Sequence, residues 1–389
     1  MFDPVVIVAA ARTPMGSFQG ELSALSATML GSLAIKAAID RAALAADDIS
    51  EVLMGCVLPA GLGQAPARQA ALGAGLSEAT PCTTLNKVCG SGMKAIMLGY
   101  DGIKAGSADI VVAGGMESMT NAPYLLDKAR SGQRLGHGRM IDHMFLDGLE
   151  DAYDKGRLMG SFAEDTAQQY QFTRAAQDEY ALESLRRANA ATARGAFAAE
   201  IVPIMTKSGE ISCDEGPARA RPEKIPTLRP AFRPDGTVTA ANASSISDGA
   251  AALLLMRRSE AERRGQTPLA IIVGHTSHAA APAHFSTAPI AAITKLLDKV
   301  GWQKGAVDLF EINEAFALVA MAAMRDLDLP HDKVNIHGGA CALGHPIGAS
   351  GARIVVTLLS ALRQRGETRG IASLCIGGGE ATALAVELI

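Results

Sequence analysis

Cys89 lies in a glycine-rich segment that is typical of a catalytic turn. Within residues 86–94, Gly90 and Gly92 precede an apolar run that predicts a helix over residues 93–103. A cysteine just before a helix faces unpaired backbone N–H groups and the positive end of the helix dipole, which favour a thiolate nucleophile. The glycines also allow a substrate to come close to the backbone. The alternative is a buried structural cysteine beside a glycine turn, and for Cys89 alone both interpretations stay open.

His345 and Asn313 are polar side chains placed where they could assist such a cysteine. His345 lies among glycines in residues 344–351 and is followed by proline, so it is held in place at a predicted strand-to-helix turn. An imidazole there can act as the general base for a thiol. Asn313 follows a predicted strand over residues 308–311 and opens an apolar helix, where its amide can position a water or a carbonyl oxygen. The alternatives are a loop histidine bonded to the backbone and an ordinary helix cap.

Cys375 ends a predicted strand over residues 371–376 and is followed by three glycines, residues 377–379. Three successive glycines have no packing use at a strand end. Their backbone N–H groups can line an anion or oxyanion site. The sequence therefore places a second thiol beside candidate oxyanion donors.

The elements that must position these residues alternate between apolar strands and Ala-rich helices. The sequence predicts a strand over residues 5–11, a helix over 26–43 and a strand over 109–113 that stops at Gly114 and Gly115. Alternation of this kind is typical of an α/β sheet covered by helices on both faces.

The two ends of the chain also resemble each other. Each opens with a strand rich in Ile and Val, at residues 5–8 and 270–273. Each places a small-residue turn before an apolar helix, at residues 90–92 and 348–351. A tandem duplication explains this similarity, and it predicts a site at the seam of two related halves.

Residues 119–240 interrupt this pattern with many charges and prolines and one clear helix at residues 174–194. Such an insertion usually forms a lid or a binding loop. The predicted domains are an N-terminal half, residues 1–265 (core 1–118 and 241–265, loop domain 119–240), and a C-terminal half, residues 266–389.

Composition excludes several kinds of protein. The 389 residues are 48% hydrophobic and 20% charged, with a net charge of −4 and scattered basic residues, so no nucleic-acid or anionic-lipid surface is predicted. The longest apolar run, residues 315–324, is well short of the roughly 20 residues that span a bilayer, and residues 5–11 read as a strand and not as a signal peptide. Six cysteines without a Cys-x-x-Cys spacing predict neither disulfides nor a metal site, so we expect a cytoplasmic protein.

Together, these motifs resemble those of the thiolases, which transfer acyl groups between acyl-CoA and acetyl-CoA. The four catalytic motifs of that family match, in order, residues 86–94, 313–316, 344–351 and 375–379. The resemblance runs essentially end to end and includes residues 10–14, 114–119 and 242–250. It implies a duplicated thiolase fold, with five α/β/α/β/α layers and a loop domain inserted in the first half.

The resemblance also implies a role for each candidate residue. Cys89 would be the nucleophile that carries the acyl group, His345 the base that takes its proton, and Cys375 the acid/base that exchanges a proton with the α-carbon or the departing thiol. One oxyanion hole would use His345 and a water held by Asn313, and the other the backbone N–H groups of Cys89 and Gly377. Covalent capture splits a difficult Claisen reaction into two easier steps. No metal or permanently bound cofactor is implied, and coenzyme A is the co-substrate.

The same resemblance predicts residues that bind acyl-CoA. Ser244 would face the pantetheine arm and Ala243 would line the same wall. Arg219 or Arg221 would meet the nucleotide phosphates as charge-assisted donors, and the alternative for both is a solvated loop arginine. The remaining predicted contacts are Phe285, Phe316 and Met159.

Two positions depart from the pattern of short-chain thiolases. Leu158 stands where many biosynthetic acetoacetyl-CoA thiolases have histidine before Met-Gly, and Phe285 stands where they usually have methionine. The Phe-x-x-Ala-Pro segment at residues 285–289 resembles instead thiolases that accept 2-methyl-branched substrates. The preferred acyl chain therefore stays open, and we expect Phe285 to reshape the acyl pocket.

The expected reaction is reversible, CoA-dependent cleavage of a 3-oxoacyl-CoA to acetyl-CoA and a shortened acyl-CoA, as in the β-oxidation of fatty acid metabolism. The alternative within the family is a short-chain acetoacetyl-CoA thiolase that works biosynthetically. The expected partners are acyl-CoA and CoA, without nucleic acid or membrane. We expect a homo-oligomer, dimer or tetramer, in which residues 121–140 are a candidate tetramer-forming loop.

Other classes of protein fit the motifs less well. A non-catalytic thiolase-like lipid-binding protein should have lost Cys89, His345 or Cys375, and all three are present. A decarboxylating ketosynthase would need a second histidine at Asn313. The loose Gly-x-Gly-x-x-Ala pattern at residues 90–95 lacks the preceding buried strand that a nicotinamide site requires.

Overall fold

The computed structural model describes residues 3–207 and 209–389. Strands of the N-terminal half lie side by side in the order β1 (Val5–Arg12), β10 (Ser247–Arg257), β5 (Ile110–Ser118), β3 (Glu51–Gly55) and β4 (Cys82–Leu85). The β1–β10 and β10–β5 pairs are antiparallel, whereas β5, β3 and β4 are parallel. The predicted strand at residues 5–11 is therefore confirmed.

The C-terminal half repeats this arrangement. Its strands lie in the order β11 (Ala270–Ala279), β14 (Glu380–Leu388), β13 (Arg369–Ile376) and β12 (Leu309–Ile312). Two antiparallel pairs are again followed by a parallel pair. Strands β1 and β11 pair only through Val6–Ile271 and Ile7–Ala270, which joins the two halves into one hydrogen-bonded sheet. The matching strand order supports the predicted duplication.

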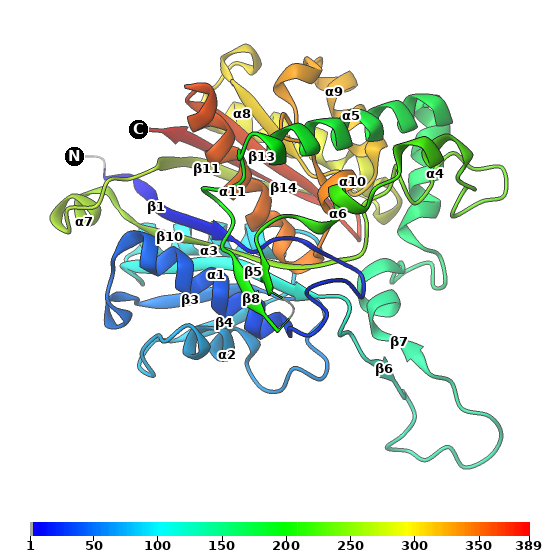
Figure 1. The fold of residues 1–389 in the computed structure, drawn as a ribbon, viewed down its shortest axis with the longest axis horizontal. Coiled ribbons are helices and arrows are strands. Elements are labelled where there is room, and N and C mark those ends of the chain that lie inside the picture. Colours follow the sequence, from blue (N-terminus) through cyan, green and yellow to red (C-terminus); the bar gives the residue numbers. More distant parts are fainter. Residues whose placement is uncertain (1–2, 208) are drawn as a thin grey trace.

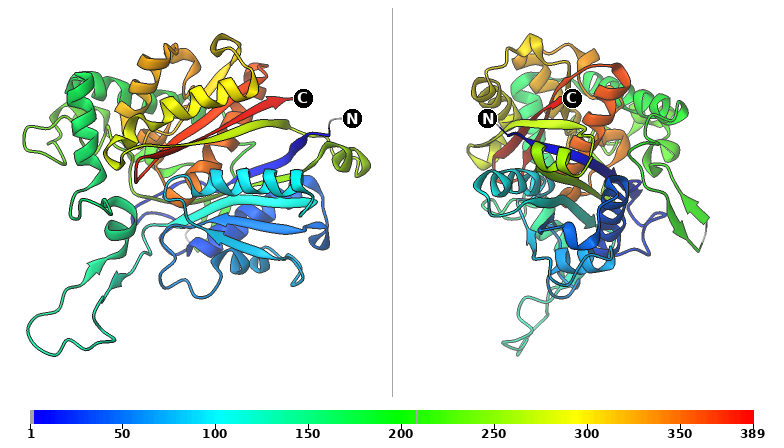
Figure 2. Two further views of the ribbon diagram at one scale, coloured as in Figure 1. Left: turned by 180° about the vertical axis from the view of Figure 1, so that it is seen from behind. Right: turned by 90° about the vertical axis from the view of Figure 1, so that its left-hand side faces the viewer.

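Helices divide the molecule into five layers, as predicted (Figures 1 and 2). On the outer face of the N-terminal strands lie α1 (Ala27–Ala42) and α2 (Pro66–Gly73). Between the two halves lie α3 (Ser91–Ala105) and α11 (Ile347–Arg365). On the outer face of the C-terminal strands lie α8 (Ala288–Val300) and α9 (Ala317–Leu327). Every residue of α11 from Ile347 to Leu362 is buried, as expected of a helix enclosed on all sides.

The two central helices touch backbone to backbone near their N-termini. A Cβ atom on Gly351 of α11 would lie 2.4 Å from the backbone nitrogen of Met93, and one on Gly92 of α3 would lie 2.8 Å from that of Ala352. The predicted small-residue turns before these two helices are wrong. Ser91 and Gly92 lie inside α3, and residues 348–351 lie inside α11. The small size of these residues allows the helices to touch.

Strand β5 likewise continues through the glycines that were predicted to stop it. It runs to Ser118, past Gly114 and Gly115. A Cβ atom on Gly115 would lie 2.0 Å from the carbonyl oxygen of Gly348, and one on Gly114 would lie 2.1 Å from that of Ala251. These glycines allow close approach of α11 and β10, and the strand needs no turn there.

The segment between β5 and β10 carries most of the irregular structure. A long arm between β6 (Tyr124–Leu125) and β7 (Ile141–Asp142) projects from the body (Figures 1 and 2). The predicted helix at residues 174–194 is confirmed as α5 (Arg174–Ala193), whereas α4 (Met159–Tyr170) was not predicted. The other strands and α-helices are β2 (Gly16–Ser17), β8 (Ile204–Thr206), β9 (Gly209–Ile211), α6 (Glu215–Arg219), α7 (Arg258–Arg263) and α10 (Ala340–Leu343).

Short helical turns complete the chain. They are η1 (Ala46–Asp48), η2 (Phe145–Leu149), η3 (Pro222–Thr227), η4 (Pro282–Thr287), η5 (Lys304–Ala306) and η6 (His331–Lys333). Across the described residues, no helix is long and apolar enough to cross a membrane.

The contact between the central helices predicts the effect of adding one methyl group. Gly351→Ala should lower the free energy of unfolding by about 1–3 kcal/mol, because the new Cβ atom meets backbone that cannot move aside cheaply. Urea unfolding measures this change. Gly102→Ala in α3 is the matched control, since its Cβ atom would meet only the Ser107 hydroxyl at 3.4 Å; it should leave stability unchanged or raise it slightly. Equal stability of both variants would contradict the prediction.

Candidate active site

Cys89 is presented by a strained turn that ends at helix α3. Val88 has a φ of +46°, which is unusual for a β-branched residue and costs about 1–3 kcal/mol. The turn is held by Asn86 Oδ1, which accepts from the Val88 N–H at 2.8 Å, and by Ser91 Oγ, which accepts from the Lys87 N–H at 2.8 Å. Because α3 begins at Ser91, Cys89 lies just before the helix, as predicted.

His345 lies just before α11 and is fixed by its neighbours. The Ser350 hydroxyl donates to the Pro346 carbonyl at 2.9 Å, so its oxygen accepts from His345 Nδ1, which lies at 2.5 Å. This arrangement places the proton of the neutral ring on Nδ1 and leaves Nε2 as the basic nitrogen. Asn313 Nδ2 lies 3.5 Å from that Nε2. The segment 313–316 precedes α9, whose N-cap is Phe316, so Asn313 is not a helix cap.

Glu314 fixes the segment that carries Asn313. Its completely buried carboxylate accepts hydrogen bonds from four donors. They are the Tyr180 hydroxyl at 3.0 Å, the Ser184 hydroxyl at 2.7 Å, Asn335 Nδ2 at 2.8 Å and the Cys341 N–H at 3.0 Å. Tyr180 and Ser184 belong to α5, so the inserted segment helps to position a residue of the C-terminal half.

Cys89, His345, Cys375 and Gly377 meet at one pocket of about 370 Å³. Its lining also contains Ser244, Ala243, Phe285, Phe316 and Met159, all of which the sequence pointed to. Members that the sequence analysis did not single out are Phe145, Gly148, Leu149, Gly160, Ala231, Phe232, Thr239, Ala240, Ser245, Ile246, Ala315 and Ile347. A larger groove of about 820 Å³ beside α5 and α9 contains none of the candidate catalytic residues.

Burial keeps the groups at the centre of this pocket uncharged. It raises the pKa of Cys89 to about 11, although the N–H groups of Gly377 and of Cys89 itself oppose this by hydrogen-bonding to the sulfur. Burial, followed by the charge of Arg353, lowers the pKa of His345 to about 3. Burial also raises the pKa of Cys375, and the nearby Cys89 adds to that shift. The expectation that the helix end gives a thiolate is therefore wrong, because desolvation outweighs it.

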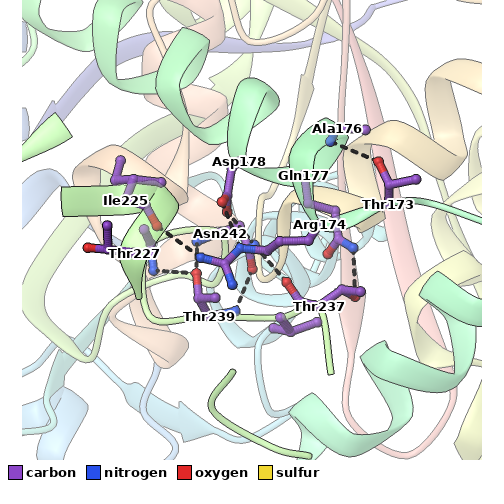
Figure 3. Close-up of polar contacts among 12 residues, drawn as sticks. Thr173, Arg174, Ala176, Gln177, Asp178, Ile225, Thr227, Thr237, Thr239 and Asn242 are labelled. Carbon is purple, nitrogen blue, oxygen red and sulfur yellow. Dashed lines mark hydrogen bonds and ion pairs between the residues drawn. The ribbon is translucent and has the colours of Figure 1, made fainter. Parts of the chain in front are cut away.

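One wall of the pocket, residues 239–244, is held by α5 (Figure 3). Asp178 of α5 accepts from Asn242 Nδ2 at 2.9 Å and pairs with Arg174 at 2.6 Å. The Asn242 side chain in turn donates to the Thr237 carbonyl at 3.0 Å and accepts from the Thr239 N–H at 2.7 Å. A single buried amide thus connects the inserted helix to the pocket wall.

The same wall is bonded to the segment after β12. The Ser244 N–H donates to the Ala315 carbonyl at 2.9 Å, and the Ala317 N–H donates to the Asn242 carbonyl at 2.8 Å. Ala243 and Phe316 form a β-bridge between them. The pocket is therefore closed by main-chain contacts between the two halves.

Arg219 and Arg221 are not brought into this pocket. Arg219 instead forms an ion pair with Glu215 at 2.6 Å, and its side chain is largely exposed. Arg221 is exposed just before η3. Their predicted contact with the CoA nucleotide stays a prediction.

The roles of two residues of the site, Phe232 and Ser350, were not predicted from the sequence. Phe232 lies in a proline-rich stretch without periodicity, yet its ring meets that of Phe316 edge to face at a centroid distance of 6.1 Å. Ser350 was read as part of a small-residue turn, and the structure places it as the partner of His345. The sequence signal that could have identified this partner is a serine five residues after the candidate base and inside a helix.

Comparison with known proteins decides the family. Residues 5–259 match the family description "Thiolase, N-terminal domain", and residues 266–388 match "Thiolase, C-terminal domain". The chain belongs to the thiolase family. The sequence-based resemblance is therefore confirmed, and this thiolase is an acyltransferase.

Full-length relatives of this thiolase share about half of its residues. It is 52% identical to the acetyl-CoA acetyltransferase of Escherichia coli (strain K12) over 388 residues, which cover 98% of each chain. It is 51% identical to acetyl-CoA acetyltransferase 2 of Arabidopsis thaliana over 393 residues, 99% of this chain and 97% of the relative. The crystal structure of the Acat5 thiolase from Ascaris suum in complex with coenzyme A matches with a TM-score of 0.95 and 42% identity, covering 99% of this chain and 100% of that one.

No group of three or more metal-ligating side chains comes together in residues 3–207 and 209–389.

The high pKa of Cys89 predicts how its reactivity depends on pH. The rate of alkylation by iodoacetamide should rise about tenfold per unit between pH 6 and pH 9, because only the thiolate reacts. Mass spectrometry of the peptide that contains Cys89 measures the rate, and the exposed Cys213 in the same sample is the internal reference. A constant rate below pH 7 would show a preformed thiolate and contradict the prediction.

The aromatic wall predicts a specificity change. Phe285 is buried and meets Phe316 edge to face at a centroid distance of 6.2 Å. Phe285→Met should alter the ratio of kcat/KM for acetoacetyl-CoA to that for 2-methylacetoacetyl-CoA by about 10-fold or more, the amount expected from reshaping an apolar pocket. Phe172→Met, the same change outside the pocket lining, is the control. An unchanged ratio in Phe285→Met would refute this role.

Proposed function

We propose that this thiolase cleaves a 3-oxoacyl-CoA through an acyl group carried on Cys89. The observation that carries the proposal is the meeting of Cys89, His345 and Cys375 at one apolar pocket. Cys89 and His345, hereafter the catalytic pair, are a thiol and a neutral imidazole at rest. The proton therefore leaves the sulfur only as it attacks the substrate.

In the first step, Cys89 Sγ bonds to C3 of the substrate while its proton passes to His345 Nε2, and the π electrons of the C3 carbonyl move onto its oxygen. That oxyanion then re-forms the carbonyl as the C2–C3 bond breaks, and the electron pair of the broken bond forms the enolate of acetyl-CoA. Cys375 donates its proton to C2 of that enolate. The products are acetyl-CoA and an acyl group bound to Cys89 as a thioester.

In the second step, free CoA gives its thiol proton to the Cys375 thiolate and its sulfur attacks the thioester. Cys89 leaves as a thiolate and recovers its proton from the His345 imidazolium. Every protein group returns to its starting state, so the same steps in reverse give the Claisen condensation.

Two sets of donors would stabilise the oxyanions of these steps. The N–H groups of Cys89 and Gly377 face the sulfur and would bind the oxygen on the carbon attached to it. Protonated His345 and a water held by Asn313 Nδ2 would bind the thioester oxygen of the enolate. Losing one such donor costs about 3–4 kcal/mol of transition-state stabilisation.

A short acyl chain is the second candidate substrate class. Relatives at about 50% identity carry the name acetyl-CoA acetyltransferase, and apolar side chains such as Phe285 and Met159 crowd the pocket beside Cys375. These observations favour acetoacetyl-CoA, in the direction of cleavage or synthesis. Coenzyme A is proposed as co-substrate, with Ser244 and Ala243 along its pantetheine arm and Arg219 or Arg221 toward its nucleotide.

Further proposals concern the assembly, the cellular location and the domain limits. A homotetramer is supported by the projecting arm, whose Leu126, Leu135 and Met140 are exposed. A cytoplasmic location is supported by the six free cysteines. A role in β-oxidation is supported by the proposed direction of the reaction, which is thiolysis. The loop domain is proposed to span residues 119–240 between halves that meet at residues 265 and 266.

The test is the rate of thiolysis with free CoA. The substrates are acetoacetyl-CoA, 2-methylacetoacetyl-CoA and linear 3-oxoacyl-CoA of increasing length. We expect activity that Cys89→Ala abolishes, and the chain-length profile separates the two candidates. Absence of Cys89-dependent activity on every substrate would overturn the proposal and would favour a non-catalytic acyl-CoA-binding role.

A further inference from the structure

Glu117 lies near the end of β5, behind the catalytic pair, and has no part in the chemistry proposed above. Its side chain is completely buried. Its carboxylate nevertheless accepts hydrogen bonds from two separate segments. The donors are the N–H groups of Val57 at 3.0 Å, Leu58 at 3.2 Å and Gly348 at 2.9 Å, and the Cys56 thiol at 3.7 Å.

We propose that Glu117 is a positioning residue for the thiolase reaction, which holds together the loop beside Cys89 and the helix turn beside His345. The inference rests on the proposed function of the catalytic pair. Glu117 touches neither substrate nor reacting atoms, so its effect passes through its neighbours.

The two segments that Glu117 joins form the surroundings of Cys89. Val57, Leu58 and Ile347 belong to one buried apolar cluster, and Cys89 packs against it. Gly348 follows Ile347 in the first turn of α11, three residues after His345. One carboxylate therefore holds the loop beside the nucleophile and the helix turn beside the base.

The fit at Gly348 is close enough to require glycine. A Cβ atom there would lie 2.7 Å from Glu117 Oε2. The Gly348 N–H is also one of the first four of α11, which have no partner within the helix. A carboxylate at this end satisfies that donor and interacts favourably with the helix dipole.

Glu117 is held by backbone donors and not by a cation. Within the described part of the chain, no lysine, arginine or histidine lies within ion-pair distance of it. Burial raises the pKa of Glu117 to about 7, and the N–H groups of Val57, Leu58 and Gly348 oppose this shift. The hydrogen bonds that Glu117 accepts, and not a fixed charge, are therefore what it contributes to the site.

The first test is Glu117→Gln, which keeps the shape of the side chain but replaces one acceptor oxygen by an NH₂ group. The kcat for thiolysis should fall about 10- to 100-fold with KM unchanged, because the new NH₂ group faces N–H donors and displaces the pair. A kcat equal to that of the unmodified chain would overturn the proposal.

Glu117→Asp keeps the carboxylate but shortens the side chain. Because the carboxylate no longer reaches both segments, kcat should fall with KM unchanged. An unchanged kcat would overturn the proposal. If Glu117→Gln does not fold, Glu117→Asp alone still decides it.

Asp308→Asn is the matched control in the other half of the chain. Asp308 also accepts from two backbone N–H groups, those of Thr368 at 3.0 Å and Arg369 at 2.8 Å. It lies outside the pocket, so kcat should not change. Absence of thiolysis in the unmodified chain would refute the proposed function, whereas a fall in kcat confined to the Glu117 variants concerns Glu117 alone.

Discussion

The close contact between α3 and α11 is the constraint on which the rest of the site depends. Both helices lie between the two halves of the sheet, and each carries a catalytic candidate at its N-terminal end. Gly92 and Gly351 allow the two backbones to approach to a distance that a Cβ atom on either would prevent. Because protein interiors are close-packed, a small separation of these helices would move Cys89 away from His345. The duplication therefore contributes to the site, since each half supplies one of the two central helices.

Burial of the site then determines its resting charge. The apolar surroundings raise the pKa of Cys89 and lower that of His345, so the pair is neutral where a more exposed thiol and imidazole would form an ion pair. Neutral groups suit a pocket that must also accept an apolar acyl chain, because a fixed charge there would have to be desolvated.

The inserted segment helps to close the pocket. Helix α5 reaches the C-terminal half through Glu314 and the pocket wall through Asn242. Both contacts are buried networks in which each polar group has a partner, and such networks specify one arrangement more strongly than apolar packing does. The insertion therefore forms part of the candidate site and is not merely a cover over it.

The sequence alone determined the family, the α/β layers and the residue types at the centre of the site, because strands, helix α5 and the motifs around Cys89, His345 and Cys375 depend on local patterns. It misjudged the glycines at 114–115 and 348–351, since a glycine that relieves a tertiary contact looks the same as one that ends an element. It also predicted a thiolate at Cys89, because the helix end is visible in the sequence whereas the desolvation that outweighs it is not. Ser350 as the partner of His345, the carboxylate of Glu117 and the aromatic wall were decided only by tertiary structure, because each depends on segments far apart in the chain or on a side-chain direction that no local pattern encodes.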